Sequence, residues 1–152
     1  MQDIISEVHS FLSDSVDPLQ TRFLFQGRPS EAALKDAPLI LILGNHSSGK
    51  STFVNYFADQ PIQLTGMAPT DDDFTILRYG GVENERPGSS VVSNPSFGLE
   101  ELSQFGPKFL SHLKLKSLPN QRLEKVTLVD TPGMIDPADA SANRGYDFKG
   151  VV

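Results

Sequence analysis

The sequence predicts an α/β fold with three layers and a mostly parallel sheet, preceded by an amphipathic helix. Three observations predict it. An unbroken apolar run at 39–43 is typical of a strand covered on both faces, a helical pattern follows at 50–58, and a second apolar run at 126–129 ends in an acid. We therefore expect an N-terminal helical segment at 1–37 and an α/β domain at 38–152.

Each element follows from its own pattern. Apolar residues at helical spacing between Ile4 and Val16 predict the first helix, which Asp17-Pro18 interrupts. The strand at 39–43 lies between Pro38 and Gly44, and the helix at 50–58 ends before Asp59-Gln60-Pro61.

The second half of the chain is less regular. Residues 74–79 predict a strand that Gly80-Gly81 closes, and residues 81–98 are expected to be irregular. A helix is expected on either side of Gly106-Pro107, on apolar positions that run from Leu102 to Leu113.

Composition excludes several classes of protein. The 152 residues carry a net charge of −6 and lack cysteine, which disfavours a nucleic-acid partner and excludes disulfides and thiolate metal sites. No apolar run approaches a membrane span, and the first residues lack the basic start of a signal peptide. We expect a soluble cytoplasmic protein.

The basic residues of the second half of the chain are expected to form a solvated face, with a membrane or partner patch as the alternative. These residues are Lys108, Lys114, Lys116, Arg122 and Lys125.

The segment after the first strand matches the phosphate-binding pattern G-x-x-x-x-G-K-[ST], so we expect a P-loop NTPase fold. Backbone N–H groups of such a loop bind phosphate oxygens at the start of the next helix, and we expect His46 to contribute its N–H rather than its side chain. Lys50 supplies a positive charge for the β- and γ-phosphates, and Ser51 a hydroxyl for Mg²⁺. The predicted nucleotide-binding residues here are Gly44, Asn45, His46, Ser47, Ser48, Gly49, Lys50, Ser51 and Thr52.

The third strand leads into Asp130-Thr131-Pro132-Gly133. An acid at this position can hold Mg²⁺ through water, and Gly133 allows a backbone N–H to approach the γ-phosphate. The glycine favours a switch NTPase over a small-molecule kinase. Such a protein also needs a threonine between the two motifs, for Mg²⁺ and for the attacking water. Thr70 is our candidate and Thr65 the competitor, while the acids at 71–73 are expected to be mostly solvated.

The motifs GNHSSGKST and VDTPG resemble those of the dynamin superfamily, and most closely those of the EH-domain-containing ATPases and their relative sarcalumenin. The segments APTDDDFTIL, LPNQRLEKVTLVDTPG and RGYDF extend the similarity to residue 150. The resemblance implies a membrane-associated, mechanochemical NTPase whose G domains dimerise and assemble into oligomers on curved lipid. Residues before the phosphate loop would belong partly to a helical domain.

The resemblance also assigns roles. Ser47 matches a serine that dynamins use to stabilise the transition state, and Thr70 matches the family's switch threonine. Ser47 and Thr70 are therefore the predicted catalytic residues. Ser51, Thr70 and Asp130 are the predicted magnesium residues. The chain departs from the family at His46, where dynamins carry glutamine or EH-domain proteins an aromatic residue, and at Asp71, where the family has a second threonine.

The base-reading motif [NT]-K-x-D does not occur, so the choice between GTP and ATP stays open. We expect a partial G domain whose first strand lacks one neighbour, which would make the isolated chain poorly soluble or oligomeric. The leading function is a membrane-remodelling NTPase. The alternatives are a truncated, non-catalytic nucleotide-binding or interaction module and, more remotely, a P-loop kinase.

Overall fold

The computed structural model describes residues 2–16, 37–63, 73–134 and 145–152. Its contacts divide the chain into two units, residues 1–36 and 37–152, and each is described by itself. In the first unit, helix α1 (Gln2–Phe11) continues into a π-helical turn, η1 (Leu12–Val16), which confirms the expected N-terminal helix. Apolar side chains of α1 are exposed at Ile4, Val8 and Phe11.

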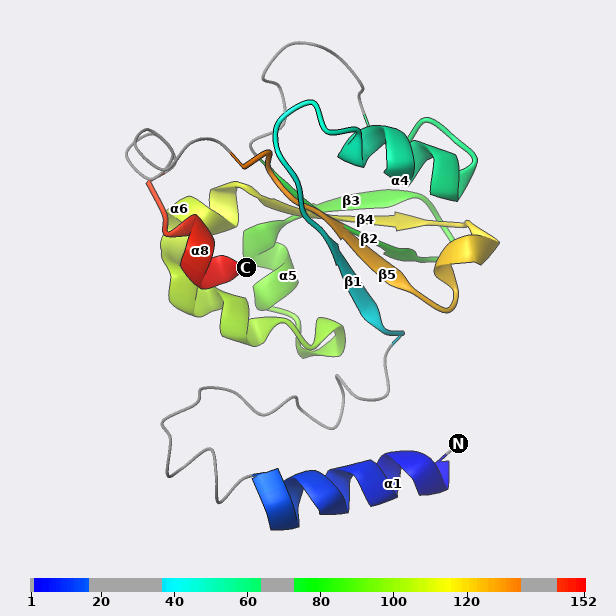
Figure 1. The fold of residues 1–152 in the computed structure, drawn as a ribbon, viewed down its shortest axis with the longest axis vertical. Coiled ribbons are helices and arrows are strands. Elements are labelled where there is room, and N and C mark those ends of the chain that lie inside the picture. Colours follow the sequence, from blue (N-terminus) through cyan, green and yellow to red (C-terminus); the bar gives the residue numbers. More distant parts are fainter. Residues whose placement is uncertain (1, 17–36, 64–72, 135–144) are drawn as a thin grey trace. The chain divides into compact units, whose positions relative to one another are not determined.

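The second unit is built on a five-stranded sheet with the order β1-β5-β2-β4-β3 (Figure 1). Its strands are β1 (Leu39–Ile42), β2 (Phe74–Tyr79), β3 (Asn84–Pro87), β4 (Leu113–Leu118) and β5 (Thr127–Asp130). The pairs β1–β5 and β2–β4 are parallel, while β2–β5 and β3–β4 are antiparallel. Because Ile42 pairs with Asp130, the strands β1 and β5 end together, and the loops that leave them start side by side.

Helices cover both faces of this sheet (Figure 1). Helix α4 (Lys50–Ala58) and the turn η4 (Gln121–Leu123) lie on one face. The other face carries α5 (Gly88–Val92), η2 (Pro95–Phe97), η3 (Glu100–Phe105), α6 (Gly106–Ser111) and α8 (Phe148–Val151). The expected three-layer α/β fold is therefore confirmed.

Alternation along β2 creates the two cores. Phe74 and Ile76 belong to one apolar cluster, and Leu77 belongs to the other. In a strand, successive side chains point to opposite faces, so one six-residue strand supplies both layers. The first cluster is Phe74, Ile76, Val91, Phe109, Leu113, Leu115, Val129 and Tyr146, and the second is Val54, Leu77, Leu118, Leu123 and Leu128.

Two sequence expectations were wrong. Residues 81–98 are not wholly irregular, because β3 and α5 form within them. All four residues of β3 are exposed, so this edge strand has no apolar pattern, and its pairing with β4 decides its structure. Leu113 does not extend the preceding helix but begins β4, in which Leu113 and Leu115 are buried in the first cluster while Lys114 and Lys116 are half-buried on the opposite face.

The surface includes an exposed sheet edge. Strand β1 pairs with β5 and, among the described residues, has no strand on its other side, in line with the expected exposed edge. Leu39 and Ile40 point to opposite faces and are 51% and 49% exposed.

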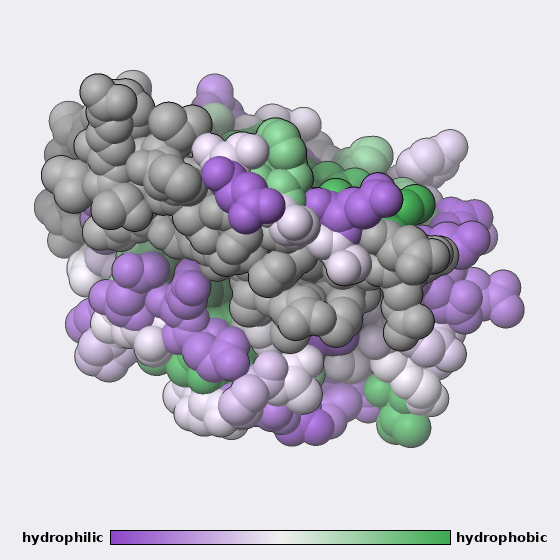
Figure 2. Space-filling view, turned by 90° about the horizontal axis from the view of Figure 1, so that it is seen from below, coloured by the Kyte–Doolittle hydropathy of each residue, from purple (hydrophilic) through white to green (hydrophobic). Residues whose placement is uncertain are grey.

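On the face drawn in Figure 2, the described surface is mostly polar, and apolar residues show as separate areas. No helix in the described part of the chain is long and apolar enough to cross a bilayer.

Candidate functional site

The predicted phosphate loop connects β1 to α4 and starts the helix through Gly49. Gly49 has φ 89°, a left-handed conformation that costs glycine little, and its carbonyl accepts the first helical hydrogen bond from Phe53 N at 2.8 Å. Ser47 also adopts a left-handed conformation, with φ 58°. Residues 45–49 are all exposed. These exposed residues lie at a helix N-terminus, which is where proteins bind anions.

The Lys50 side chain folds back onto this loop. Its Nζ donates to the carbonyl oxygen of Gly44 at 3.0 Å and to that of Asn45 at 2.9 Å. An ammonium group has three donors and no acceptor, so two backbone carbonyls hold the charge at the loop without neutralising it. The positive charge thus lies beside the loop, where the oxygens of a bound phosphate would replace the two carbonyls as hydrogen-bond acceptors.

Ser51 and Asp130 bring two oxygen donors together from different elements. Ser51 Oγ, in the first turn of α4, donates to Asp130 Oδ2, at the end of β5, over 3.3 Å. Asp130 is 4% exposed. A hydroxyl that donates its proton to a carboxylate still offers lone pairs, and hydroxyl and carboxylate oxygens suit a hard cation such as Mg²⁺. The residues present therefore fit the expected magnesium site.

The segment after β5 lies directly against the phosphate loop. Met134 N donates to Gly44 O at 3.0 Å, and Thr131 Oγ1 donates to Ile42 O at 2.8 Å. A Cβ at Gly133 would lie 2.8 Å from His46 Cα and 2.9 Å from His46 N. Only glycine allows this approach, which puts the Gly133 backbone beside the predicted phosphate site.

The structure thus gathers most of the predicted site residues at one end of β1 and β5. His46 contacts Gly133 through its backbone, while its side chain is exposed. Thr52 is exposed on the first turn of α4. Thr70, its competitor Thr65 and the acids Asp71 and Asp72 lie outside the described residues.

Sequence reasoning missed Gln63, which follows α4 and is 6% exposed. Its Nε2 donates to Asp130 Oδ2 at 2.9 Å, so Asp130 receives hydrogen bonds from both Ser51 and Gln63. No motif marks this glutamine. It reaches the site because Asn55, on α4, binds the Gln63 backbone: Asn55 Oδ1 accepts from Gln63 N and Asn55 Nδ2 donates to Gln63 O, both at 2.8 Å.

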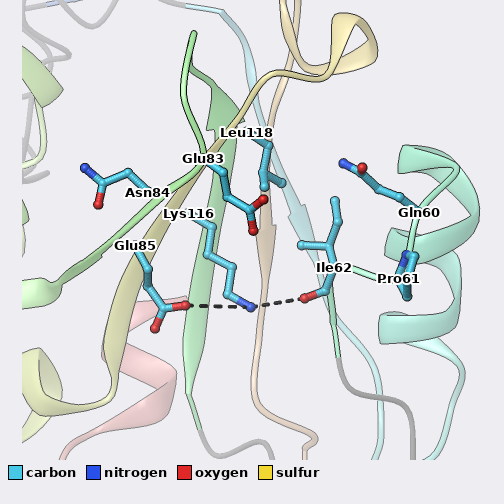
Figure 3. Close-up of a pocket in the computed structure, with 8 residues that line it drawn as sticks. All are labelled: Gln60, Pro61, Ile62, Glu83, Asn84, Glu85, Lys116 and Leu118. Atoms are coloured by element: carbon cyan, nitrogen blue, oxygen red, sulfur yellow. Dashed lines mark hydrogen bonds and ion pairs between the residues drawn. The ribbon is translucent and has the colours of Figure 1, made fainter.

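The expectation of a solvated basic face was wrong for two lysines of β4, Lys114 and Lys116, whose side chains are 23% and 20% exposed. Lys116 Nζ donates to Ile62 O at 3.1 Å and to Gln63 Oε1 at 3.2 Å. It also lies 3.9 Å from Glu85 Oε2, within a pocket of about 450 Å³ (Figure 3). The alternating pattern of LKLKSL was the signal that could have placed Lys116 on a strand.

Lys114 pairs with Asp73, the described member of the acidic run. The distance from Lys114 Nζ to Asp73 Oδ2 is 3.3 Å, and His112 Nδ1 lies 3.1 Å from Asp73 Oδ1. Asp73 is therefore held just before β2 by two residues near the start of β4, rather than mostly solvated as the sequence had led us to expect.

Comparison with known proteins identifies the family. The family model described as "Dynamin family" matches residues 40–144, which include most of β1, the predicted phosphate loop and the Asp130–Gly133 segment. The chain belongs to the dynamin family. This dynamin-family chain is 33% identical over 159 residues to EH domain-containing protein 2 of Rattus norvegicus, and 36% identical over 142 residues to the protein of the same name in Homo sapiens. It is also 36% identical over 142 residues to EH domain-containing protein 3 of Rattus norvegicus.

These matches cover unequal shares of the two chains. The three alignments take in 100%, 89% and 89% of the dynamin-family chain but 29%, 26% and 26% of the respective relatives. The chain therefore spans less than a third of the length of the curated relatives it matches. A solved structure titled "An oligomerised bacterial dynamin pair provides a mechanism for the long-range sensing and tethering of membranes" aligns with 94% of this chain and 27% of its own, at 21% identity and a TM-score of 0.43.

Proposed function

We propose that this dynamin-family chain binds a nucleoside triphosphate together with Mg²⁺, as part of a membrane-remodelling NTPase. The observation that carries the proposal is the convergence of Lys50, Ser51 and Asp130 beside the loop that starts α4. A cation, a hydroxyl and a carboxylate at a helix N-terminus are the groups that a magnesium–triphosphate complex requires. The nucleotide is GTP or ATP.

In this proposal the chain's residues act by holding charge in place. Backbone N–H groups of the loop and the Lys50 ammonium bind the phosphate oxygens, while Ser51 and Asp130 hold Mg²⁺, with Thr70 as the further candidate. When bound, Mg²⁺ neutralises charge that develops on the transferring phosphoryl group. The Gly133 backbone borders the γ-phosphate, and Ser47 contacts the reacting group. Catalysis is then electrostatic stabilisation by groups already in position.

We further propose that the protein assembles with copies of itself through this domain and associates peripherally with membranes from the cytoplasmic side. The support is the membership of the dynamin family and the similarity to EH domain-containing proteins. In this proposal the N-terminal segment at 1–37, in which Ile4 and Phe11 are exposed, belongs partly to a helical domain, and residues 38–152 belong to a partial G domain.

Replacing Ser51 with alanine tests the magnesium site. Removing a ligand hydroxyl that also bonds Asp130 should raise the Mg²⁺ concentration needed for tight binding of a fluorescent triphosphate by about tenfold. Binding without Mg²⁺ should change little, because the loop and Lys50 are untouched. Ser96→Ala, at an exposed serine on another helical turn, is the matched control. An unchanged Mg²⁺ dependence in Ser51→Ala would contradict the assignment.

Ser47→Gly separates binding from hydrolysis. Glycine adopts φ 58° more readily than serine, so the loop should keep its shape while the hydroxyl is lost. We expect nucleotide affinity within about twofold of wild type, and phosphate release under multiple-turnover conditions reduced by roughly a hundredfold, as for the loss of one transition-state donor. If the wild-type chain itself releases no more phosphate than Lys50→Ala, the hydrolysis part of the proposal is wrong and a non-catalytic binding module is the better description.

A further inference from the structure

The side-chain amide of Gln63 bridges two groups of opposite charge. Its Nε2 donates to Asp130 Oδ2 at 2.9 Å, and its Oε1 accepts from Lys116 Nζ at 3.2 Å. Gln63 is 6% exposed, so water competes little for either bond. The result is a chain of contacts, buried at Asp130 and partly buried at Lys116, that runs from β4 through Gln63 to the carboxylate that the proposed function assigns to Mg²⁺.

The two charges allow the amide only one orientation. An amide has a donor end and an acceptor end, whereas an ammonium can only donate and a carboxylate can only accept. If the Gln63 amide were turned over, its oxygen would face the Asp130 carboxylate and its NH₂ group would face the Lys116 ammonium. Asp130 and Lys116 together therefore determine that the donor end points to Asp130.

Each of the three residues in this chain of contacts is also held by other groups. The Gln63 backbone is held by Asn55, and the preceding N–H, of Ile62, donates to Asn55 Oδ1 at 2.9 Å. Lys116 Nζ is held by the Ile62 carbonyl and faces Glu85 across the pocket (Figure 3). Asp130 is anchored by the pairing of β5 with β1 and β2. With both ends held, the amide acts as a rigid spacer.

We propose that Gln63 and Lys116 are positioning residues that set the Mg²⁺ affinity of the site. Gln63 holds the Asp130 carboxylate in the orientation that faces Ser51, and Lys116 holds Gln63. This inference rests on the proposed function, because it concerns the metal that Asp130 and Ser51 would bind. It adds two residues from outside the phosphate loop and the Asp130–Gly133 segment.

The test is a double-mutant cycle read out by magnesium titration. Gln63→Met keeps the length of the side chain but removes the donor, and Lys116→Met removes the charge that orients it. With a fluorescent triphosphate, the Mg²⁺ midpoint should rise about tenfold in Gln63→Met, the lower end of the range for loss of a group that orients a metal ligand. It should rise less, about threefold, in Lys116→Met, because Lys116 acts only through Gln63, which keeps its donor in that variant. The double variant should match Gln63→Met alone, because Lys116 acts through Gln63. Binding in EDTA should stay within about twofold of wild type in all three variants, since their loop and Lys50 are unchanged.

Two controls separate positioning from general damage. Gln60→Met makes the same chemical change three residues earlier, at an exposed position on the same pocket, and should leave the midpoint unchanged. Lys116→Arg keeps a donor for Gln63 Oε1 and should restore a midpoint near that of wild type. Thermal unfolding of each variant identifies any that do not fold, and the pair Lys116→Met and Lys116→Arg then decides the question.

The possible failures are distinguishable. If the wild-type chain binds the triphosphate with a clear Mg²⁺ dependence and the folded Gln63 and Lys116 variants share its midpoint, this inference alone is overturned. Additive effects of the two substitutions would overturn the linkage through the amide. If the wild-type chain shows no Mg²⁺-dependent binding, the proposed function fails and this inference fails with it.

Discussion

Lys50→Ala should weaken the binding of a nucleoside triphosphate by about a hundredfold or more. The Lys50 ammonium already makes two hydrogen bonds at the phosphate loop, to the Gly44 and Asn45 carbonyls. On binding, we expect phosphate oxygens to take their place. The exchange replaces neutral carbonyls with anionic oxygens, and removing one partner of a hydrogen-bonded charge pair costs roughly 2–5 kcal/mol, of which about 2.7 kcal/mol already corresponds to a hundredfold in Kd.

Equilibrium binding of a labelled triphosphate measures this loss directly, and the rise in melting temperature on adding nucleotide gives an independent readout. Lys125→Ala is the matched control, because it removes the same charge from an exposed lysine just before β5. Its affinity should stay within about twofold of wild type, since distant surface charges are largely screened. A Lys50→Ala variant that binds like the Lys125→Ala control would remove the basis of the proposed function.

Gly133→Ala should damage both the fold and the site. The new methyl carbon would lie 2.8 Å from His46 Cα and 2.9 Å from His46 N, and these backbone atoms cannot rotate away as a side chain could. Either the phosphate loop or the segment after β5 must move. Overpacking of this kind costs about 1–3 kcal/mol. Because the displaced atoms belong to the phosphate loop, triphosphate affinity should also fall by roughly tenfold or more.

Urea unfolding and nucleotide titration on the same variant measure the two effects together. Gly81→Ala is the control: a Cβ there meets nothing within 4 Å, and Gly81 is not among the positive-φ glycines. It should be as stable as wild type within about 0.5 kcal/mol, as for most surface substitutions. If Gly133→Ala unfolded at the same urea concentration as Gly81→Ala and bound nucleotide normally, the close approach of the two loops would be contradicted.

The elements that the sequence predicted well are those whose patterns are local. Helix 50–58 and strand 74–79 coincide with α4 and β2, and the runs at 39–43 and 126–129 match β1 and β5 to within one residue at each end. Each is an apolar run or a helical repeat next to a glycine, a proline or an acid that ends it. Such signals do not depend on a distant partner.

The missed elements depend on their partners. Strand β3 reads NERP and is exposed throughout, so only its pairing with β4 makes it a strand. Helix α5 has five residues, too few for a helical repeat, and its Gly88 sits where a Cβ would lie 2.6 Å from Leu110 O. Strand β4 alternates lysine with leucine, and its lysines find partners in Asp73 and Gln63, far away in the sequence.

The amino-acid sequence is enough to find the predicted phosphate loop and the Asp130–Gly133 segment, because both are short patterns of residue type and spacing, and the apolar runs are enough to give the α/β class. The surroundings of the Asp130 carboxylate follow from the folded chain alone. Ser51, Gln63 and Lys116 come from α4, from the segment after it and from β4, and the sheet order brings them together. A buried amide between an ammonium and a carboxylate has no local signal, since its role depends on contacts 53 and 67 positions away in the chain.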